Sequence, residues 1–432
     1  MYACMRWLRK SLLISLVGMP QRRRFRFRRC PRFRHLAVVM ILLSFMFSAY
    51  VFVYTVPNER SRDDSFEDVE KNRKPDFTET RKGKIRQNLI IVAHGRSGSS
   101  FTGNIFNHHP SVFYLFEPYQ TVERLHGGVA PFNRDYQEKS FEWMQGVFQC
   151  KFVSPKHAND IQHYYRKVVG KASRETQASI ALSSPPFCRY NTTDSRWTLQ
   201  DSCPDPFEQK MLEEVCEKKY SLTVVKALMG RMPNTDIEQL INVCDSSQEF
   251  DCKLLFLVRD PRGIIPSSKA VRFYRETDKA GLANSRMFSY HNCRQTELNL
   301  NIIRKLPPRW RKQIKILRYE DLAKDPSKLL PSLLEFAGLP MDKGLSDWLY
   351  LASHKPKTES DQKAAPWRQD SFEGADRWRW KVSPYEINII EHYCRPVMKL
   401  LGYRPLDYSY EMQRNLSIRL LDDHFEALDW LE

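Results

Sequence analysis

The sequence predicts an α/β fold in which helices flank a central parallel sheet, and three observations predict it. Leu89–Ala93, Val112–Phe116 and Leu254–Val258 are short apolar runs, typical of strands buried on both faces. A polar turn ends each run, and a helix-like segment follows two of these turns. About 345 residues follow position 87, enough to bury one large core. We therefore expect a single α/β domain over residues 88–410.

The first apolar run leads into a glycine- and serine-rich loop. We expect the strand Leu89–Ala93, a tight loop over Gly95–Ser100 and a helix over Phe101–Asn107. The start of a helix presents free N–H groups and the positive end of its dipole, so an anion binds there readily. Gly98 lets the backbone approach this anion closely, and Arg96 adds a planar guanidinium. Further hydroxyl donors come from Ser97, Ser99, Ser100 and Thr102.

A second arginine-bearing turn follows Leu254–Val258. Arg259 ends this strand, and Ser267 lies eight residues later, where we expect the first turn of a helix beyond Asp260-Pro261. A guanidinium at a strand end and a hydroxyl at a helix start can hold one phosphate between them. Each turn taken alone is also compatible with a plain surface turn. Together they indicate a nucleotide held by two separate phosphates.

The first loop differs from the phosphate loop of magnesium-dependent nucleotide hydrolases. That loop reads GxxxxGK[ST], but no lysine follows Gly98 here. The sequence also shows no cluster of metal ligands. A nucleotide kinase or phosphohydrolase, which would need magnesium, is therefore disfavoured but stays an alternative.

With both motifs in place, the chain resembles the Golgi carbohydrate sulfotransferases, specifically those that sulfate the 6-hydroxyl of galactose, N-acetylglucosamine or N-acetylgalactosamine. RSGSSF at Arg96–Phe101 matches their loop for the 5′-phosphosulfate of 3′-phosphoadenosine 5′-phosphosulfate (PAPS), and VRDPRGI at Val258–Ile264 with Ser267 matches their 3′-phosphate motif. The ordered set continues with VFYLFEP, RYEDLAKDP and Trp378-Arg379, and runs from about Asn88 to Tyr403. The resemblance implies a P-loop-like sulfotransferase fold in which PAPS is bound by Gly95, Arg96, Ser97, Gly98, Ser99, Ser100, Phe101, Arg259 and Ser267.

The resemblance also implies the reaction, a transfer of the sulfuryl group from PAPS to a sugar hydroxyl of a glycosaminoglycan or glycoprotein glycan. A sulfuryl group carries less negative charge than a phosphoryl group, so we expect no obligatory metal. His94-Gly95 stands before Arg96 where the family's loop usually reads TxRSGSS. Because of this departure, the acceptor sugar stays open.

Two side chains are candidates for the chemistry. Arg96, by its place in the loop, would neutralise charge on the leaving oxygen. Glu117 follows the strand Val112–Phe116 and faces the nucleotide rim, and the resemblance gives it the role of base. The alternative is that Glu117 is an exposed glutamate in a turn fixed by Pro118, without a role in the chemistry. Histidines are the competing bases, namely His94, His108, His109 and His126, although His108 and His109 are better placed to cap a helix.

Other polar residues near the motifs each have two alternative roles or a structural one. Lys226 ends an apolar run and could reach the sulfate or acceptor, or be a solvated strand-end lysine. Glu320 and Asp321 of the RYED element are expected to brace the nucleotide site as hydrogen-bond acceptors. A later loop with Arg368, Trp378 and Arg379 could close on the nucleotide or sugar, or simply pack.

The first 87 residues predict a membrane anchor. Residues 36–56 form a 21-residue run without a charged side chain, long enough to span a bilayer as a helix. Eleven Lys and Arg residues and no Asp or Glu precede it, so residues 1–35 should stay in the cytosol and the rest of the chain in the lumen. A cleaved signal peptide is the less favoured alternative, because the basic region is long and no small-x-small site follows. Residues 57–87, rich in charge, are expected to form a flexible stem.

The net charge belongs mostly to this tail. The chain has a formal net charge of +17, and the tail contributes +11 of it. The rest of the chain has 57 basic and 51 acidic residues, a net charge of +6. Nucleic-acid binding is therefore unsupported, and the small excess suits an anionic nucleotide and an acidic glycan. The oligomeric state cannot be deduced from these patterns.

The cysteines and glycosylation sequons support the prediction that the chain after residue 56 lies in the lumen of the Golgi. Eight cysteines follow the predicted span, an even number that indicates disulfides without fixing their pairing. Asn191 and Asn415 begin glycosylation sequons. Residues 411–432 are expected to be an appended amphipathic tail. A catalytically inactive, membrane-anchored glycan-binding protein that keeps the fold is the remaining alternative.

Overall fold

The computed structural model describes residues 85–165, 178–188, 208–273, 283–354 and 371–431. These residues belong to one compact unit. The expected cytosolic tail, membrane span and most of the stem lie outside them. Within the described ranges, no helix combines the length and the apolar character needed to cross a bilayer.

Five parallel strands form the central sheet. Their order is β2-β3-β1-β4-β5, and every pairing is parallel. The strands are β1 (Arg86–Ala93), β2 (Val112–Phe116), β3 (Leu222–Leu228), β4 (Phe250–Val258) and β5 (Ile314–Arg318). Leu89–Ala93 and Leu254–Val258 are buried throughout, as expected for strands covered on both faces. The predicted α/β class with a central parallel sheet is therefore confirmed.

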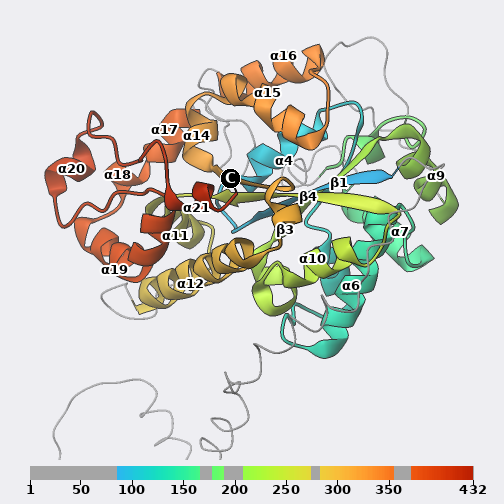
Figure 1. Cartoon of the computed structure of the whole chain (residues 1–432), viewed down its shortest axis with the longest axis horizontal. Helices are drawn as coiled ribbons and strands as arrows, with labels where there is room; N and C mark the ends of the chain where they lie inside the picture. The colour runs from blue at the N-terminus through green and yellow to red at the C-terminus, as the bar shows by residue number, and fades with distance from the viewer. Residues whose placement is uncertain (1–84, 166–177, 189–207, 274–282, 355–370, 432) are drawn as a thin grey trace, which may run out of the picture. The chain divides into compact units, whose positions relative to one another are not determined.

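Helices cover both faces of this sheet (Figure 1). The helix α4 packs on β1, β2 and β3, while α6 contacts β1, α10 contacts β4, and α12 lies along α19. In Figure 1, α4, α15 and α16 lie above the sheet, and α6, α10 and α12 lie below it. The helices are α4 (Ser99–Asn107), α5 (Tyr119–His126), α6 (Arg134–Gln149), α7 (Pro155–Tyr165), α9 (Gln209–Lys219), α10 (Glu238–Asp245), α11 (Pro261–Ala270), α12 (Ala283–Lys305), α13 (Pro308–Arg311), α14 (Tyr319–Lys324), α15 (Pro326–Ala337), α16 (Lys343–Ser353), α17 (Ser371–Asp376), α18 (Trp378–Lys381), α19 (Pro384–Leu400), α20 (Tyr410–Arg414) and α21 (Glu426–Asp429).

The strand order creates a switch point between β1 and β4. The connection from β1 through α4 leads to β2 on one side of the sheet, whereas the connection from β4 through α11 leads to β5 on the other. In open parallel sheets, ligands bind beyond the carboxyl ends of the strands at such a point. Both arginine-bearing turns lie there, because one follows β1 and the other follows β4.

Several predicted boundaries need correction. The helix after the first loop begins at Ser99 rather than Phe101, because the left-handed Gly98 is its N-cap. The helix after the second turn begins at Pro261, where Asp260 caps it, so Ser267 lies in the second turn of α11 rather than the first. The strand β1 takes in Arg86 and Gln87, which were expected to belong to the stem.

The boundary expected at residue 410 does not separate two units. Leu421 forms an antiparallel bridge with Tyr403, and Gln413, Phe425 and Ala427 are buried. The guanidinium of Arg379 donates hydrogen bonds to carbonyl oxygens of Met412, Gln413, Asn415 and Ile418. Residues 411–431 are thus part of the domain rather than an appended tail.

The described residues contain disulfides, as the even number of cysteines after residue 56 predicted. Cys150 pairs with Cys216, Cys244 with Cys252, and Cys293 with Cys394, which links α12 to α19. Cys188 is also disulfide-bonded, and Cys203 lies outside the described residues.

Candidate functional site

The two arginine-bearing turns touch each other at the carboxyl end of the sheet. Arg96 Nε donates a hydrogen bond to Ser267 Oγ over 3.0 Å. Arg259 Nη1 donates another to the backbone oxygen of Arg96 over 2.9 Å. Residues 163 and 171 positions apart in sequence therefore form one site.

The first loop is shaped to expose the start of α4. Gly98 has a φ of +88°, and the loop also holds Arg96 at a φ of +70°. Ser97 is buried and closes the loop by donating from Oγ to the backbone oxygen of His94 over 2.8 Å. No side chain caps α4 and no acidic residue lies in its first turn. The first N–H groups of α4 are thus left for an anion.

Tyr319 connects the two turns. A Cβ atom on Gly98 would lie 2.1 Å from the Tyr319 ring, so only glycine fits beneath it. The guanidinium of Arg259 lies 4.8 Å above the centre of the same ring. Arg259 Nη2 donates to Gly374 O over 3.1 Å, while its Nε is buried and has no hydrogen-bond partner among the described residues. A phosphate oxygen suits this leftover donor.

Glu117 lies beyond the end of β2 in a buried ion-pair cluster. The residue is only 5% exposed, and its φ is +49°. Oε1 lies 2.7 Å from Lys226 Nζ, and Oε2 accepts from Gln120 Nε2 over 2.6 Å and lies 3.3 Å from Arg231 Nε. The exposed turn glutamate considered above is therefore wrong. A strained backbone with fixed polar partners is common where function requires one geometry.

Lys226 joins Glu117 to the phosphate loop. It lies inside β3 rather than at its end, is 2% exposed, and its Nζ is 3.5 Å from Ser100 Oγ. The strand pairing explains this placement, because Lys226 pairs with Phe116 of β2 on one side and with Ile91 of β1 on the other. Of the two alternatives for Lys226, the solvated strand-end lysine is therefore wrong.

Electrostatics keep Glu117 ionised. Burial alone would raise its pKa, but Lys226, Gln120 and Arg231 outweigh burial and hold the pKa below its usual value. Burial lowers the pKa of Lys226 and Arg96 adds to the effect, although Glu117 opposes it. The cluster therefore presents a carboxylate together with a cation that is poorly solvated.

Arg231 and Gln120 were not predicted as site residues, although both contact Glu117. Arg231 follows β3 in a 3₁₀ turn at Met229–Arg231 and also pairs with Glu123. Gln120 is the second residue of α5. The signal available for Gln120 was its spacing of three residues from Glu117, typical of contacts at a helix start. No local pattern connects Arg231 to Glu117, because their contact depends on the pairing of β2 with β3.

The competing histidines are engaged elsewhere. His94 Nε2 lies 2.9 Å from Thr296 Oγ1, and burial lowers its pKa to about 4. His108 Nδ1 lies 2.8 Å from Asn104 O at the end of α4, and burial lowers its pKa to about 4 as well. His109 Nε2 lies 3.0 Å from Pro340 O. The expectation that these two histidines cap the helix end is confirmed for His108 but not for His109, whose ring contacts a distant segment instead. His126 lies exposed at the end of α5.

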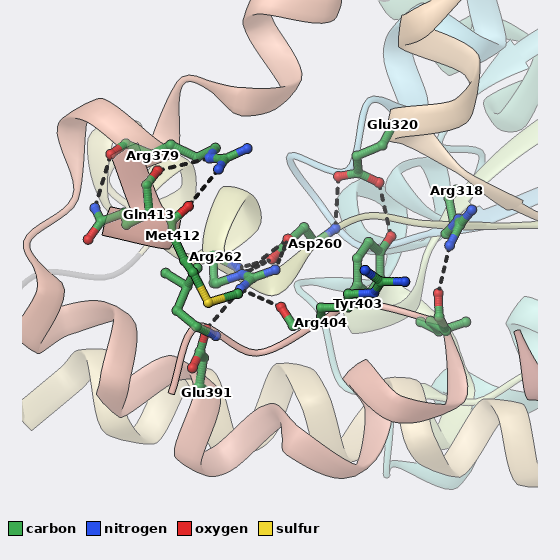
Figure 2. A network of polar contacts seen from close by, with 12 residues as sticks. Asp260, Arg262, Arg318, Glu320, Arg379, Glu391, Tyr403, Arg404, Met412 and Gln413 are labelled. Carbon is green, nitrogen blue, oxygen red and sulfur yellow. Dashed lines mark hydrogen bonds and ion pairs between the residues drawn. The ribbon is translucent and has the colours of Figure 1, made fainter. Parts of the chain in front are cut away.

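Glu320 of the RYED element braces the second turn, as expected, because its Oε1 accepts from Asp260 N over 3.0 Å (Figure 2). Asp321 instead pairs with Arg318 of its own element at 2.7 Å. Trp378 and Arg379 are both buried, and they follow the packing alternative rather than lining an open loop. Asn415 is exposed, while Arg368 and Asn191 lie outside the described residues. Within the described part of the chain, no three His, Cys, Asp or Glu side chains gather in a way that could hold a metal.

Comparisons with known proteins agree with this geometry. The model of the sulfotransferase family matches residues 88–343. Carbohydrate sulfotransferase 1 of Danio rerio is 27% identical over 361 residues, covering 78% of this chain and 82% of the relative. Carbohydrate sulfotransferase 6 of Homo sapiens is 25% identical over 371 residues, covering 78% and 86%.

A solved structure, the sulfotransferase domain from the curacin biosynthetic pathway, is 17% identical with a TM-score of 0.36 and covers 72% of this chain and 98% of that domain. The family match spans more than half of the chain and contains both arginine-bearing turns. This chain belongs to the sulfotransferase family, and its curated relatives are carbohydrate sulfotransferases.

Proposed function

We propose that the protein transfers the sulfuryl group of PAPS to a hydroxyl of a glycan. One observation carries the proposal, namely the contact of Arg96 with Ser267 and of Arg259 with the Arg96 backbone. It joins the two turns that the family resemblance assigns to opposite ends of PAPS. A single nucleotide can reach both turns only if they lie side by side.

The residues of the two turns suit the two ends of this co-substrate. Gly95–Phe101 would hold the 5′-phosphosulfate by the free N–H groups of α4, with the hydroxyls of Ser99 and Ser100 as further donors. Arg259 and Ser267 would hold the 3′-phosphate, and the unpartnered Nε of Arg259 is one donor for it. PAPS supplies the activated sulfuryl group, and no metal is part of the proposal.

Glu117 is the proposed base. The acceptor hydroxyl gives its proton to the Glu117 carboxylate as its oxygen forms a bond to sulfur. The bond from sulfur to the bridging oxygen breaks, and that oxygen keeps the electron pair as part of the phosphate. Arg96 and Lys226 are the nearby cations that would stabilise this charge. Lys226 contacts both Glu117 and Ser100, so it links the base to the phosphate loop.

The low pKa of Glu117 has a cost and a benefit. It ensures that the carboxylate is ionised at neutral pH, but it also weakens the carboxylate as a base. A shift of Lys226 toward the leaving oxygen, as negative charge develops there, would offset this weakness. Glu117 would then lose its closest counter-charge, and its pKa would rise.

The acceptor is proposed to be a galactose, N-acetylglucosamine or N-acetylgalactosamine 6-hydroxyl, as the family resemblance implies. The names of the curated relatives specify a carbohydrate acceptor only in general. We also propose a Golgi type II topology, which the uncharged run at 36–56 and the disulfides support. Asn415 would then be an accessible glycosylation site, as would Asn191.

Sulfate transfer by the full-length chain in detergent tests this proposal. The purified chain is incubated with labelled PAPS and a panel of desulfated keratan, chondroitin and N-glycan acceptors, with and without a chelator. Wild type should label at least one acceptor in chelator, Arg259→Ala and Glu117→Gln should lose most of this activity, and the exposed Arg134→Ala should keep it. No labelling of any acceptor would contradict the enzyme assignment, whereas a fully active Glu117→Gln would contradict only the base.

A further inference from the structure

We propose that a C-terminal clamp positions Arg259 and thereby sets the affinity for the 3′-phosphate. The clamp consists of Gly374, Trp378, Glu391, Tyr403 and Arg404, all far along the chain from Arg259. This inference rests on the proposed function, because it assigns the 3′-phosphate to Arg259.

Arg262 is the main point of contact between the clamp and the second turn. Its side chain has no exposed surface and lies among acceptors on every side (Figure 2). Nη2 lies 2.7 Å from Asp260 Oδ2, and Nη1 lies 2.8 Å from Glu391 Oε1 of α19. Nη1 also donates to Arg404 O over 2.9 Å, and the guanidinium lies 4.5 Å from the centre of the Trp378 ring. Three clamp residues thus hold one guanidinium.

Asp260 is held from a second direction. Its side chain caps α11 by accepting from Arg262 N over 2.8 Å, and its N–H donates to Glu320 Oε1 over 3.0 Å. Glu320 Oε2 accepts from Tyr403 OH over 2.9 Å, so the chain of contacts returns to the clamp. Asp260 follows Arg259 directly in sequence, and fixing its backbone therefore fixes the residue that carries the phosphate-binding guanidinium.

The clamp also touches Arg259 itself. Arg259 Nη2 donates to Gly374 O of α17, while Nη1 donates to Arg96 O of the first loop. These two carbonyl oxygens set the direction of the guanidinium plane. One of them belongs to the clamp, so the orientation of Arg259 depends on how the C-terminal part packs.

The clamp in turn depends on the end of the chain. Arg379, directly after Trp378, is 3% exposed and donates to carbonyl oxygens of the segment Met412–Ile418. In return, Gln413 Nε2 donates hydrogen bonds to Arg379 O over 3.0 Å and to Val382 O over 2.9 Å. Arg379 and the segment Met412–Ile418 therefore hold α18, and with it Trp378, against Arg262.

Stability alone is a poor explanation for this network. Buried ion pairs contribute little net stability, because desolvation offsets the attraction, and apolar residues of similar size often serve as well. What directional hydrogen bonds add is a single geometry. A fixed guanidinium binds a phosphate without first losing side-chain freedom, and loss of that freedom costs free energy on binding.

Two nucleotides test the proposal by isothermal titration calorimetry of the full-length chain in detergent. Adenosine 3′,5′-bisphosphate (PAP) carries the 3′-phosphate, and adenosine 5′-monophosphate (AMP) lacks it. Glu391→Gln keeps the shape of the side chain but removes the charge paired with Arg262, and should weaken PAP binding roughly tenfold. Tyr403→Phe removes one hydrogen bond and should weaken PAP binding about threefold. Both variants should bind AMP within about twofold of wild type.

Arg395→Gln is the matched control. Arg395 lies on the same helix α19 as Glu391, but its ion pair with Asp407 is exposed, so both nucleotides should bind as they do to wild type. Equal weakening of PAP and AMP by the clamp variants would overturn the proposal in favour of general destabilisation, and unchanged binding would overturn it outright. If Glu391→Gln fails to fold, Tyr403→Phe decides by the same criterion. A wild type that binds PAP no better than AMP would instead refute the proposed function, and the clamp with it.

Discussion

Arg96 donates a hydrogen bond from Nε to Oγ of Ser267, a residue 171 positions later in the chain. The contact places the loop after β1 against the helix after β4, across the point where the strand order reverses. The proposed nucleotide site is built around this contact, and the predictions below follow from its surroundings.

Gly98 should tolerate no side chain. Gly98→Ala would combine a left-handed backbone, which costs an L-residue about 1–2 kcal/mol, with a Cβ atom 2.1 Å from the Tyr319 ring. We expect loss of nucleotide binding and a fall in unfolding free energy of more than about 3 kcal/mol, measured by denaturant titration. Gly127 is the matched control, since its φ of +89° differs by only 1° from that of Gly98 but nothing lies within 4 Å of an added Cβ. Gly127→Ala should cost only the backbone term, and equal losses at both positions would contradict the role of Tyr319.

Glu117 and Lys226 should be coupled in stability but not in activity. Either Glu117→Gln or Lys226→Met leaves one buried charge without its closest partner and should cost about 3 kcal/mol. The double variant should regain much of that loss, because no unpaired charge remains. Sulfate transfer should stay at least about a hundredfold below wild type in all three. A double-mutant cycle in urea measures the coupling, and additive losses would show that the pair is not coupled.

Glu320 should make stability depend on pH. Burial and the neighbouring Asp260 raise its pKa from 4.5 to about 7 in the folded protein. Its contribution is therefore fully present below the unfolded pKa of 4.5 and is lost as the pH rises through about 7.

We expect the melting temperature to rise as the pH falls from about 8 to about 6, and Glu320→Gln to flatten that rise. The exposed Glu335→Gln serves as the control and should leave the slope unchanged. A slope that survives in Glu320→Gln would assign the pH dependence to other groups.

The disulfides should differ in the stability they provide. The Cys293–Cys394 bond closes a span of 101 residues, and Cys244–Cys252 closes a span of 8. In the chain-entropy description, replacing both cysteines by serine should therefore cost about 2 kcal/mol more at the first pair than at the second. Urea unfolding of the two double variants compares them, and equal costs would show that loop length does not govern these bonds.

Local patterns in the sequence were enough to predict the sheet and the two turns. The residues of β2 coincide with the apolar run that indicated a strand, and Arg259 follows β4 as expected. Apolar runs ended by turn residues are local signals, and they need no knowledge of the tertiary structure. Helix starts were less accurate, because Gly98 caps one helix and Pro261 begins another although both residues also favour turns.

What the sequence analysis missed depends on contacts between distant segments. Lys226 is buried because strands lie on both sides of it, and Arg231 reaches Glu117 only through the pairing of β2 with β3. The segment after Tyr410 lacks a long apolar period, and backbone oxygens bonded to Arg379 hold it in place. Such contacts leave no periodic trace in the sequence.

The account is tested most directly by titrating PAP and AMP into wild type, Arg96→Ala and Arg259→Ala. Both nucleotides carry the 5′-phosphate, so Arg96→Ala should weaken both, each by roughly tenfold or more. Only PAP carries the 3′-phosphate, so Arg259→Ala should weaken PAP by at least as much and leave AMP within about twofold of wild type. If Arg259→Ala bound PAP as tightly as wild type does, or weakened both nucleotides equally, the two turns would not hold opposite ends of one nucleotide.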